Sequence, residues 1–229
     1  PKPLPDELLY SVLARATYRY GFWSPKQLLD LVYGRRTVAA VPDLPSNLLA
    51  LAGVTAEAWN MSVEELALRH TLVGYYTHFR GAVSRKSALV QMAFDGGSIH
   101  LQLGVCAGAA RVPKRFRLCP TCHAYDIAAY GESYWHRAHH LPGVLVCHKH
   151  GDILLETDHS FHPPARHVYA AAPLAVNMSA LAPLVPGLTR PREALALAVH
   201  SVQILESTAY ARSPRPDYRV AFEQLGWRR

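Results

Sequence analysis

The sequence predicts a mainly α-helical protein that contains a zinc-finger module of the Cys3His type. Apolar residues recur at helical spacing through most of the chain, and helix-capping residues precede several of these stretches. Three of the four cysteines fall in one histidine-rich stretch, residues 117–152. Half of the 229 residues are apolar and 18% are charged, which is typical of a globular protein with a substantial core.

The chain contains no run of 18 apolar residues and no signal-peptide pattern, so we expect a cytoplasmic protein that does not enter membranes. Four cysteines in that compartment indicate metal binding rather than a disulfide framework. The first residue is Pro rather than Met, so we also expect that the chain is processed or trimmed.

The formal net charge is +7, and its excess lies at residues 69–117 and in the C-terminal tail. A basic excess is the electrostatic signature of phosphate binding, as in proteins that bind nucleic acid. A well-solvated surface explains the same charge, so composition alone leaves both interpretations open.

The first region, residues 1–105, is predicted to be helical and to contain a helix-turn-helix. Apolar residues have helical spacing over residues 6–19. A second helix begins after a capping box of Ser24 and Gln27 and ends near Tyr33. Two helices joined by a short turn are compatible with a DNA-binding helix-turn-helix, although most such pairs are plain helical hairpins.

Further helices are predicted in the same region. A second capping box, formed by Ser62 and Glu65, opens one of them. Residues 84–93 predict another helix, with Arg85 and Lys86 exposed at its start.

The second region, residues 106–170, is predicted to be the zinc-finger module. Its pattern C-x2-C-x24-C-x2-H supplies two close pairs of ligands, which is how a chain holds a tetrahedral zinc ion: Cys119, Cys122, Cys147 and His150. His148 is an alternative to His150, whose spacing matches the first pair. We expect a helix that ends at Gly131 between the pairs, and a short β-hairpin around the second pair. Four protein ligands leave no position for water, so the zinc ion is expected to be structural.

Individual residues of this stretch are also compatible with other chemistry. Cys147, His140 and Asp126 can be selected as the nucleophile, base and orienting carboxylate of a Cys/His hydrolase, but no local catalytic signature surrounds them. The C-P-T-C pair lacks the βαβ context of a redox motif. We interpret Cys106 as a core residue and the remaining histidines as surface or hydrogen-bonded residues, with a second metal site as the less favoured alternative.

The usual parts of a catalyst are missing from the sequence. It contains no P-loop, no dinucleotide-binding fingerprint, no nucleophile elbow and no acidic cluster of the two-metal kind. We therefore expect a protein that is not an enzyme.

Basic residues on the N-terminal helices and before the zinc ligands are the candidate DNA contacts. They are Lys26, Arg35, Arg36, Arg85, Lys86, Arg111, Lys114, Arg115 and Arg117. For each of them, a solvated surface role is about as compatible with the sequence as a phosphate contact.

The third region, residues 171–229, is predicted to be helical and to begin a further domain. An amphipathic helix is expected over about 191–212, followed by a short closing helix. The sequence contains no internal repeat and no low-complexity tract.

Several motifs resemble the TniQ/TnsD family of transposon target-site selectors, and within it the TnsD branch. The resemblance covers about residues 4–156 and rests on PDELLYSVLARATYRYG, SPKQLLDLVYG and the block RLCPTC-x7-YGESYWHRAHHLPGVLVCHKHG. The ordered combination of C-P-x-C, Y-G-E, W-x-R, L-P and C-x-K-H-G is specific, although no single piece is.

The resemblance implies a largely helical fold with a helix-turn-helix, a zinc finger with the same four ligands, and no catalytic activity. It implies that the protein binds double-stranded DNA at an attachment site and is then associated with the bacterial nucleoid. It also implies recruitment of the AAA+ ATPase regulator TnsC, which activates the transposase. A fragment that acts mainly as an adaptor for TnsC is the alternative. Members of the TnsD branch extend further with additional DNA-binding modules, so we expect an N-terminal fragment.

Overall fold

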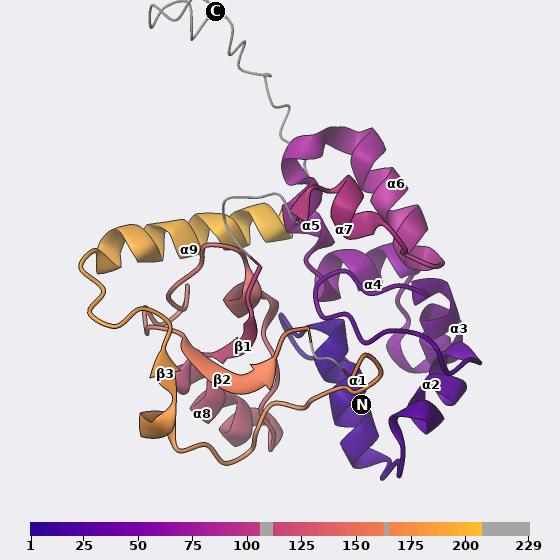
Figure 1. Cartoon of the computed structure of the whole chain (residues 1–229), viewed down its shortest axis with the longest axis horizontal. Helices are drawn as coiled ribbons and strands as arrows, with labels where there is room; N and C mark the ends of the chain where they lie inside the picture. Colours follow the sequence, from indigo (N-terminus) through magenta and orange to yellow (C-terminus); the bar gives the residue numbers. More distant parts are fainter. Residues whose placement is uncertain (106–111, 163–164, 208–229) are drawn as a thin grey trace, which may run out of the picture.

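The computed structural model describes residues 1–105, 112–162 and 165–207, drawn in colour in Figure 1. The helices are α1 (Leu9–Arg19), α2 (Pro25–Tyr33), α3 (Leu48–Trp59), α4 (Val63–His70), α5 (Val73–Thr77), α6 (Gly81–Ala93), α7 (Ile99–Gln102), α8 (Pro120–Tyr130) and α9 (Pro191–Glu206). The strands β1 (Arg115–Leu118), β2 (Leu155–Ser160) and β3 (Ala182–Pro183) form one antiparallel sheet in the order β1-β2-β3. Short 3-10 turns are η1 (His78–Arg80), η3 (Arg137–His140) and η4 (Met178–Ala180). No helix in these described ranges is long and apolar enough to cross a membrane.

The helices predicted from capping residues begin where the sequence places them. Helix α2 starts after a complete capping box at Ser24 and ends at Gly34 in the left-handed conformation. Helix α4 starts after the same kind of box at Ser62. Helices α1 and α2 occupy the places predicted for a helix-turn-helix, and their use as a DNA-binding motif stays a prediction.

Other helix ends differ from the prediction by a few residues. Helix α1 begins at Leu9 rather than at residue 6, because Asp6 has a left-handed backbone (φ 57°) that cannot continue into a right-handed helix. The helix predicted over residues 84–93 begins earlier, at Gly81. The helix predicted from residue 191 ends at Glu206, and the predicted closing helix lies outside the described residues.

Helix α1 lies at the centre of the core, between helices α2 to α7 on one side and the sheet with α8 on the other (Figure 1). All of its residues from Leu9 to Ala16 are buried. Tyr10 contacts Phe116 of β1, with 5.0 Å between the ring centroids, and Phe116 stacks on Trp135 at 4.7 Å. One connected core joins buried side chains from all three predicted regions, and the predicted boundaries after residues 105 and 170 stay predictions.

The predicted β-hairpin around the second ligand pair is present in a minimal form, as a tight turn flanked by a few antiparallel backbone contacts. Val146 and Ile153 form a single antiparallel bridge, and the chain then continues into β2. Strand β2 pairs with β1 and β3 instead of extending the hairpin. This pairing places Phe161, just after β2, 5.0 Å from Phe116 in the aromatic core, so burial of this ring favours the observed sheet.

The N-terminal segment is hydrogen-bonded to the segment that follows α8. The N–H of Leu8 donates to the carbonyl of Trp135 at 2.9 Å, and the N–H of Arg137 donates to the carbonyl of Asp6 at 2.7 Å. The two segments are distant in sequence, so these bonds fix α1 against the part of the chain that carries the metal ligands.

A buried imidazole adds an ionic contact to this junction. The Nε2 atom of His136 lies 2.8 Å from Asp126 Oδ2, and its Nδ1 lies 3.7 Å from Asp6 Oδ2. Burial alone disfavours the imidazolium, but the hydrogen bond to Asp126 and the nearby carboxylate of Asp6 outweigh burial and raise the pKa of His136 to about 9. His136 is therefore a cation at neutral pH.

We predict that the free energy of unfolding falls as the pH rises from about 6.5 to 9. The pKa of His136 in the folded chain lies above its ordinary value of 6.5, so its contribution is complete below pH 6.5 and is lost through about pH 9. A shift of this size corresponds to a contribution on the order of 3 kcal/mol. Urea unfolding at a series of pH values between 6 and 9.5 measures it.

The control for this experiment is a histidine on the surface. His136→Gln is expected to be less stable at pH 6.5 and to lose most of the pH dependence, whereas the exposed His200→Gln retains the dependence of the unaltered chain. An identical slope in His136→Gln and in the unaltered chain would show that another group is responsible.

Candidate metal centre

The first ligand pair lies at the N-terminal end of α8. Cys119 is the N-cap of this helix, and its Sγ accepts a hydrogen bond from the N–H of Cys122 at 3.4 Å. Pro120 occupies the first helical position, where the backbone N–H takes no part in helical hydrogen bonds, so proline, which lacks this N–H, is well tolerated there. The helix start therefore holds both sulfur atoms close together.

The second pair lies on the tight turn described above. The N–H of Gly151 donates to the carbonyl of Cys147, and the N–H of Cys147 donates to the carbonyl of Asp152, each at 2.8 Å. Gly151 has a φ of 74°, a left-handed conformation that glycine adopts without a steric penalty from Cβ. The turn brings Cys147 and His150 to the first pair, and His148 is not part of the cluster.

The four side chains fit a tetrahedral metal ion. Their ligand atoms all lie within 4.8 Å of one another. His150 Nδ1 lies 3.4 to 3.6 Å from each of the three sulfur atoms, and the Sγ atoms of Cys122 and Cys147 are 3.7 Å apart. Bonds of about 2.3 Å to sulfur and 2.0–2.1 Å to nitrogen require about 3.8 Å between two sulfurs and about 3.5 Å between sulfur and nitrogen. The observed spacing therefore matches a zinc-sized site.

The electrostatics of the cluster favour a bound cation. Close contacts with Cys119 and Cys147, together with burial, raise the pKa of the Cys122 thiol above its ordinary value. Three thiols at this separation cannot ionise together without a compensating charge, which a divalent cation supplies. Thiolates select soft or borderline ions over Mg²⁺ and Ca²⁺, which prefer oxygen.

Two polar contacts to the sulfur atoms were not predicted from the sequence. His139, interpreted there as a bystander, is buried, and its Nε2 lies 3.8 Å from Cys122 Sγ. Asp152 Oδ2 lies 3.2 Å from Cys119 Sγ and accepts a hydrogen bond from Thr121 Oγ1 at 2.5 Å. Contacts of this kind orient metal ligands, but they follow from the fold and have no characteristic spacing in the sequence.

The residues considered for a Cys/His hydrolase do not form a triad. His140 uses both ring nitrogens on main-chain groups, with Nε2 accepting from the N–H of Arg117 at 3.0 Å and Nδ1 2.7 Å from the carbonyl of His136. Asp126 is paired with His136 instead of His140. No base of this arrangement is therefore directed at Cys147.

The predicted DNA contacts that are exposed lie on three parts of the structure: α2 with the turn after it, α6, and the start of β1 (Figure 1). These residues are Lys26, Arg35, Arg36, Lys86, Lys114 and Arg115. Arg36 forms an ion pair with Asp30 at 2.5 Å, and Arg35 is hydrogen-bonded to Asn47. Arg111 lies outside the described residues.

Two of the predicted DNA contacts are buried, which corrects their assignment. Arg85 is 3% exposed and donates from Nε to Thr77 Oγ1 at 3.1 Å, so the prediction that it is exposed was wrong. Helix α6 packs this face on α5. Tertiary packing determines which face of the helix is buried, and the spacing of apolar residues did not reveal that face. Arg117 is 8% exposed, donates to the carbonyl of Val144 at 3.2 Å, and has a pKa lowered by desolvation.

The fold and the cluster define a helical protein built around a Cys3His centre, and comparison places it in a family. The sequence model of the TniQ family matches residues 1–154, which include all four clustered side chains. The chain belongs to the TniQ family, as its motifs predicted. It is 41% identical over 155 residues to the transposon Tn7 transposition protein TnsD of Escherichia coli. That match covers 67% of this chain and 30% of the relative, so the chain spans less than a third of the relative's length.

We predict that the purified chain holds one divalent metal ion, and that Cys119→Ser or Cys147→Ser loses both the ion and the fold. The binding free energy of a structural zinc ion, about 10–16 kcal/mol, is as large as the whole stability of a typical domain, about 5–15 kcal/mol. Metal analysis and thermal unfolding, with and without a chelator, measure the two losses.

The two neighbouring histidines provide a matched comparison. His150→Ala is expected to bind the ion more weakly and to unfold at a lower temperature, whereas His148→Ala keeps full occupancy. The reverse result would assign the fourth ligand to His148, and a full metal content in Cys119→Ser would remove the centre altogether.

Proposed function

We propose that this chain acts in the selection of transposition target sites. In this role it binds double-stranded attachment-site DNA and recruits an AAA+ ATPase of the TnsC type, and through that ATPase the transposase. The 41% identity with a transposition protein, together with the TniQ family match over residues 1–154 that contains the whole Cys3His cluster, carries this proposal. The match spans 30% of that relative, so this chain supplies part of such a selector's contacts.

The metal in this proposal is one structural zinc ion held by the four clustered side chains. When bound, zinc cross-links the start of α8 to the turn that precedes β2. Four protein ligands complete the tetrahedral coordination and leave no open position for water or substrate. The proposed role is therefore structural and the proposed protein is not an enzyme.

DNA binding in this proposal uses exposed cations and the outer face of α2. Lys26, Gln27 and Leu31 are exposed on that face, while Leu28 and Leu29 are buried against the core. In a helix-turn-helix the second helix enters the major groove, and α2 has the corresponding place after the buried α1. Lys114 and Arg115 would add phosphate contacts from the start of β1.

An adaptor that contacts DNA weakly and binds mainly the ATPase is the second candidate. The exposed candidate cations lie on three separate parts of the molecule, and a strong non-specific DNA site usually gathers its cations on one face. A mobility shift of an attachment-site duplex by this chain alone supports the selector, and a shift only with the ATPase and ATP supports the adaptor.

We predict that Lys114→Glu with Arg115→Glu weakens binding to all duplexes and lowers the salt dependence of the affinity. Each lost phosphate contact reduces the slope of log K against log salt by about 0.9, so two contacts reduce it by about 1.8. Anisotropy titrations at several salt concentrations, on an attachment-site duplex and an unrelated duplex, measure this.

The control carries the same change of charge at another place. Arg190→Glu with Arg192→Glu alters two exposed arginines at the start of α9 and is expected to leave the slope near that of the unaltered chain. Equal losses in the two double variants would indicate attraction by net charge alone and would remove the assignment of contacts at β1.

A further inference from the structure

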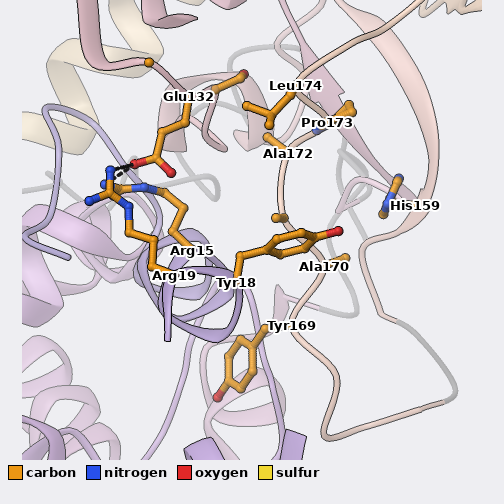
Figure 2. Close-up of a pocket in the computed structure, with 13 residues that line it drawn as sticks. Arg15, Tyr18, Arg19, Glu132, His159, Tyr169, Ala170, Ala172, Pro173 and Leu174 are labelled. Carbon is orange, nitrogen blue, oxygen red and sulfur yellow. Dashed lines mark hydrogen bonds and ion pairs between the residues drawn. The ribbon is translucent and has the colours of Figure 1, made fainter. Parts of the chain in front are cut away.

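A groove beside the C-terminal end of α1 lies outside the metal centre and the predicted DNA contacts. It has a volume of about 650 Å³ and is bounded by the last turn of α1, residues 131–133 after α8, residues 169–174, and His159 of β2. Figure 2 shows the labelled side chains of these segments around it. Sites that bind ligands in proteins have volumes of about 300–1,000 Å³, so the groove is large enough for several side chains.

The lining of the groove is largely apolar and partly open to solvent. Tyr18, Tyr169, Leu174 and the residues 170–173 form most of it. Tyr18 is 81% exposed and Leu174 is 60% exposed, high values for large side chains beside a cavity. Apolar surface that is exposed around a concavity is typical of a binding site.

The charged residues in the groove neutralise one another. Glu132 Oε1 lies 2.8 Å from Arg15 Nη2 and 2.5 Å from Arg19 Nη2, the ion pairs drawn in Figure 2. The other terminal nitrogen of Arg15 lies 2.7 Å from Glu7 Oε2. Two arginines are thus balanced by two glutamates, so the groove offers no excess positive charge to a phosphate.

The main chain along one side of the groove has an unused edge. The N–H of Ala170 donates to the Tyr10 hydroxyl, and its carbonyl accepts from Trp135 Nε1, each at 2.8 Å. Residues 168–173 form neither helix nor turn. No hydrogen bond within the described residues uses the N–H or the C=O of Ala171, so both groups remain open to a partner.

We propose that this groove binds an extended peptide segment of a protein partner. The peptide packs bulky apolar side chains against Tyr18 and Leu174 and hydrogen-bonds the open main-chain edge at Ala171. The neutral, apolar lining favours such a segment over nucleic acid. Peptide binding by the groove goes beyond the proposed function and does not rest on it.

The test is a selection of displayed random 12-residue peptides on the immobilised chain, followed by anisotropy titration of the selected peptides. We expect the selected peptides to share bulky apolar side chains. Their Kd is expected to rise at least tenfold on Tyr18→Ala and on Leu174→Glu. Both altered side chains are exposed, so both variants are expected to fold, which circular dichroism checks.

Two exposed residues outside the groove are the matched controls. Tyr20, which is 65% exposed, and Leu197 of α9, which is 50% exposed, do not line it. Tyr20→Ala and Leu197→Glu are expected to change the Kd less than twofold.

The proposal would be overturned if no peptide is enriched. It would also be overturned if the selected peptides bind the groove variants as tightly as they bind the control variants. A dimer in light scattering that Leu174→Glu dissociates would overturn it as well, because the groove would then be an interface between two copies. Cross-linking of duplex or single-stranded DNA to a photoreactive residue placed at Tyr18 would likewise overturn the proposal, because it would assign the groove to nucleic acid. If the chain bound peptides through the groove but did not bind duplex DNA, only the proposed function would be contradicted, and the proposal for the groove would stand.

Discussion

The position of Asp6 is the constraint on which the arrangement of the described chain depends. Its left-handed backbone, at φ 57°, costs about 1–2 kcal/mol for a residue with a Cβ. The contacts it makes offset that cost: its carbonyl accepts from the N–H of Arg137 at 2.7 Å, and its carboxylate accepts from Arg137 Nε and the N–H of Ala138, each at 3.2 Å. Burial alone would raise the pKa of Asp6, but contact with His136 and the positive charge of Arg137 lower it to about 2, so the carboxylate stays charged. Asp6 lies two residues before Leu8, the N-cap of α1, and Leu8 is itself hydrogen-bonded to Trp135, so these bonds position the start of the central helix against this segment.

The segment that Asp6 holds also supports the metal centre, which explains the motif YGESYWHRAHH physically. Gly131 ends α8 with a φ of 75°, and the chain then turns so that Glu132 meets Arg15 of α1. Trp135 packs on Phe116, and a few residues later His139 lies 3.8 Å from the sulfur of Cys122. One short segment therefore contacts α1 on one side and the ligand turns on the other. A disturbance at the metal centre is expected to reach α1 through this segment.

The sequence showed local features well and long-range ones poorly. The capping boxes at Ser24 and Ser62 placed α2 and α4, because a cap is formed by neighbouring residues. The same holds for the four clustered side chains, because two ligands three residues apart are brought together locally, by a helix start in the first pair and a tight turn in the second. The start of α1 was missed because Asp6 is held by residues far along the chain, and the pairing of β2 with β1 was missed for the same reason. The exposure of Arg85 was wrong because packing, and not spacing, selects the buried face of α6.

The burial of charge separates the two kinds of binding that we propose. Among the described residues, the buried arginines are Arg15, Arg85, Arg117 and Arg137, and the buried acids are Glu7, Asp43 and Asp126. With histidines counted as neutral, as in the formal charge of +7, the four buried arginines and three buried acids of the described residues remove a net charge of only +1, which leaves exposed cations for the proposed DNA contacts. The arginines nearest the groove are satisfied by Glu7 and Glu132 and add little to this attraction. If both proposals hold, a neutral groove on a basic protein lets a peptide dock without competing for the cations proposed to contact DNA, and the two kinds of binding are compatible.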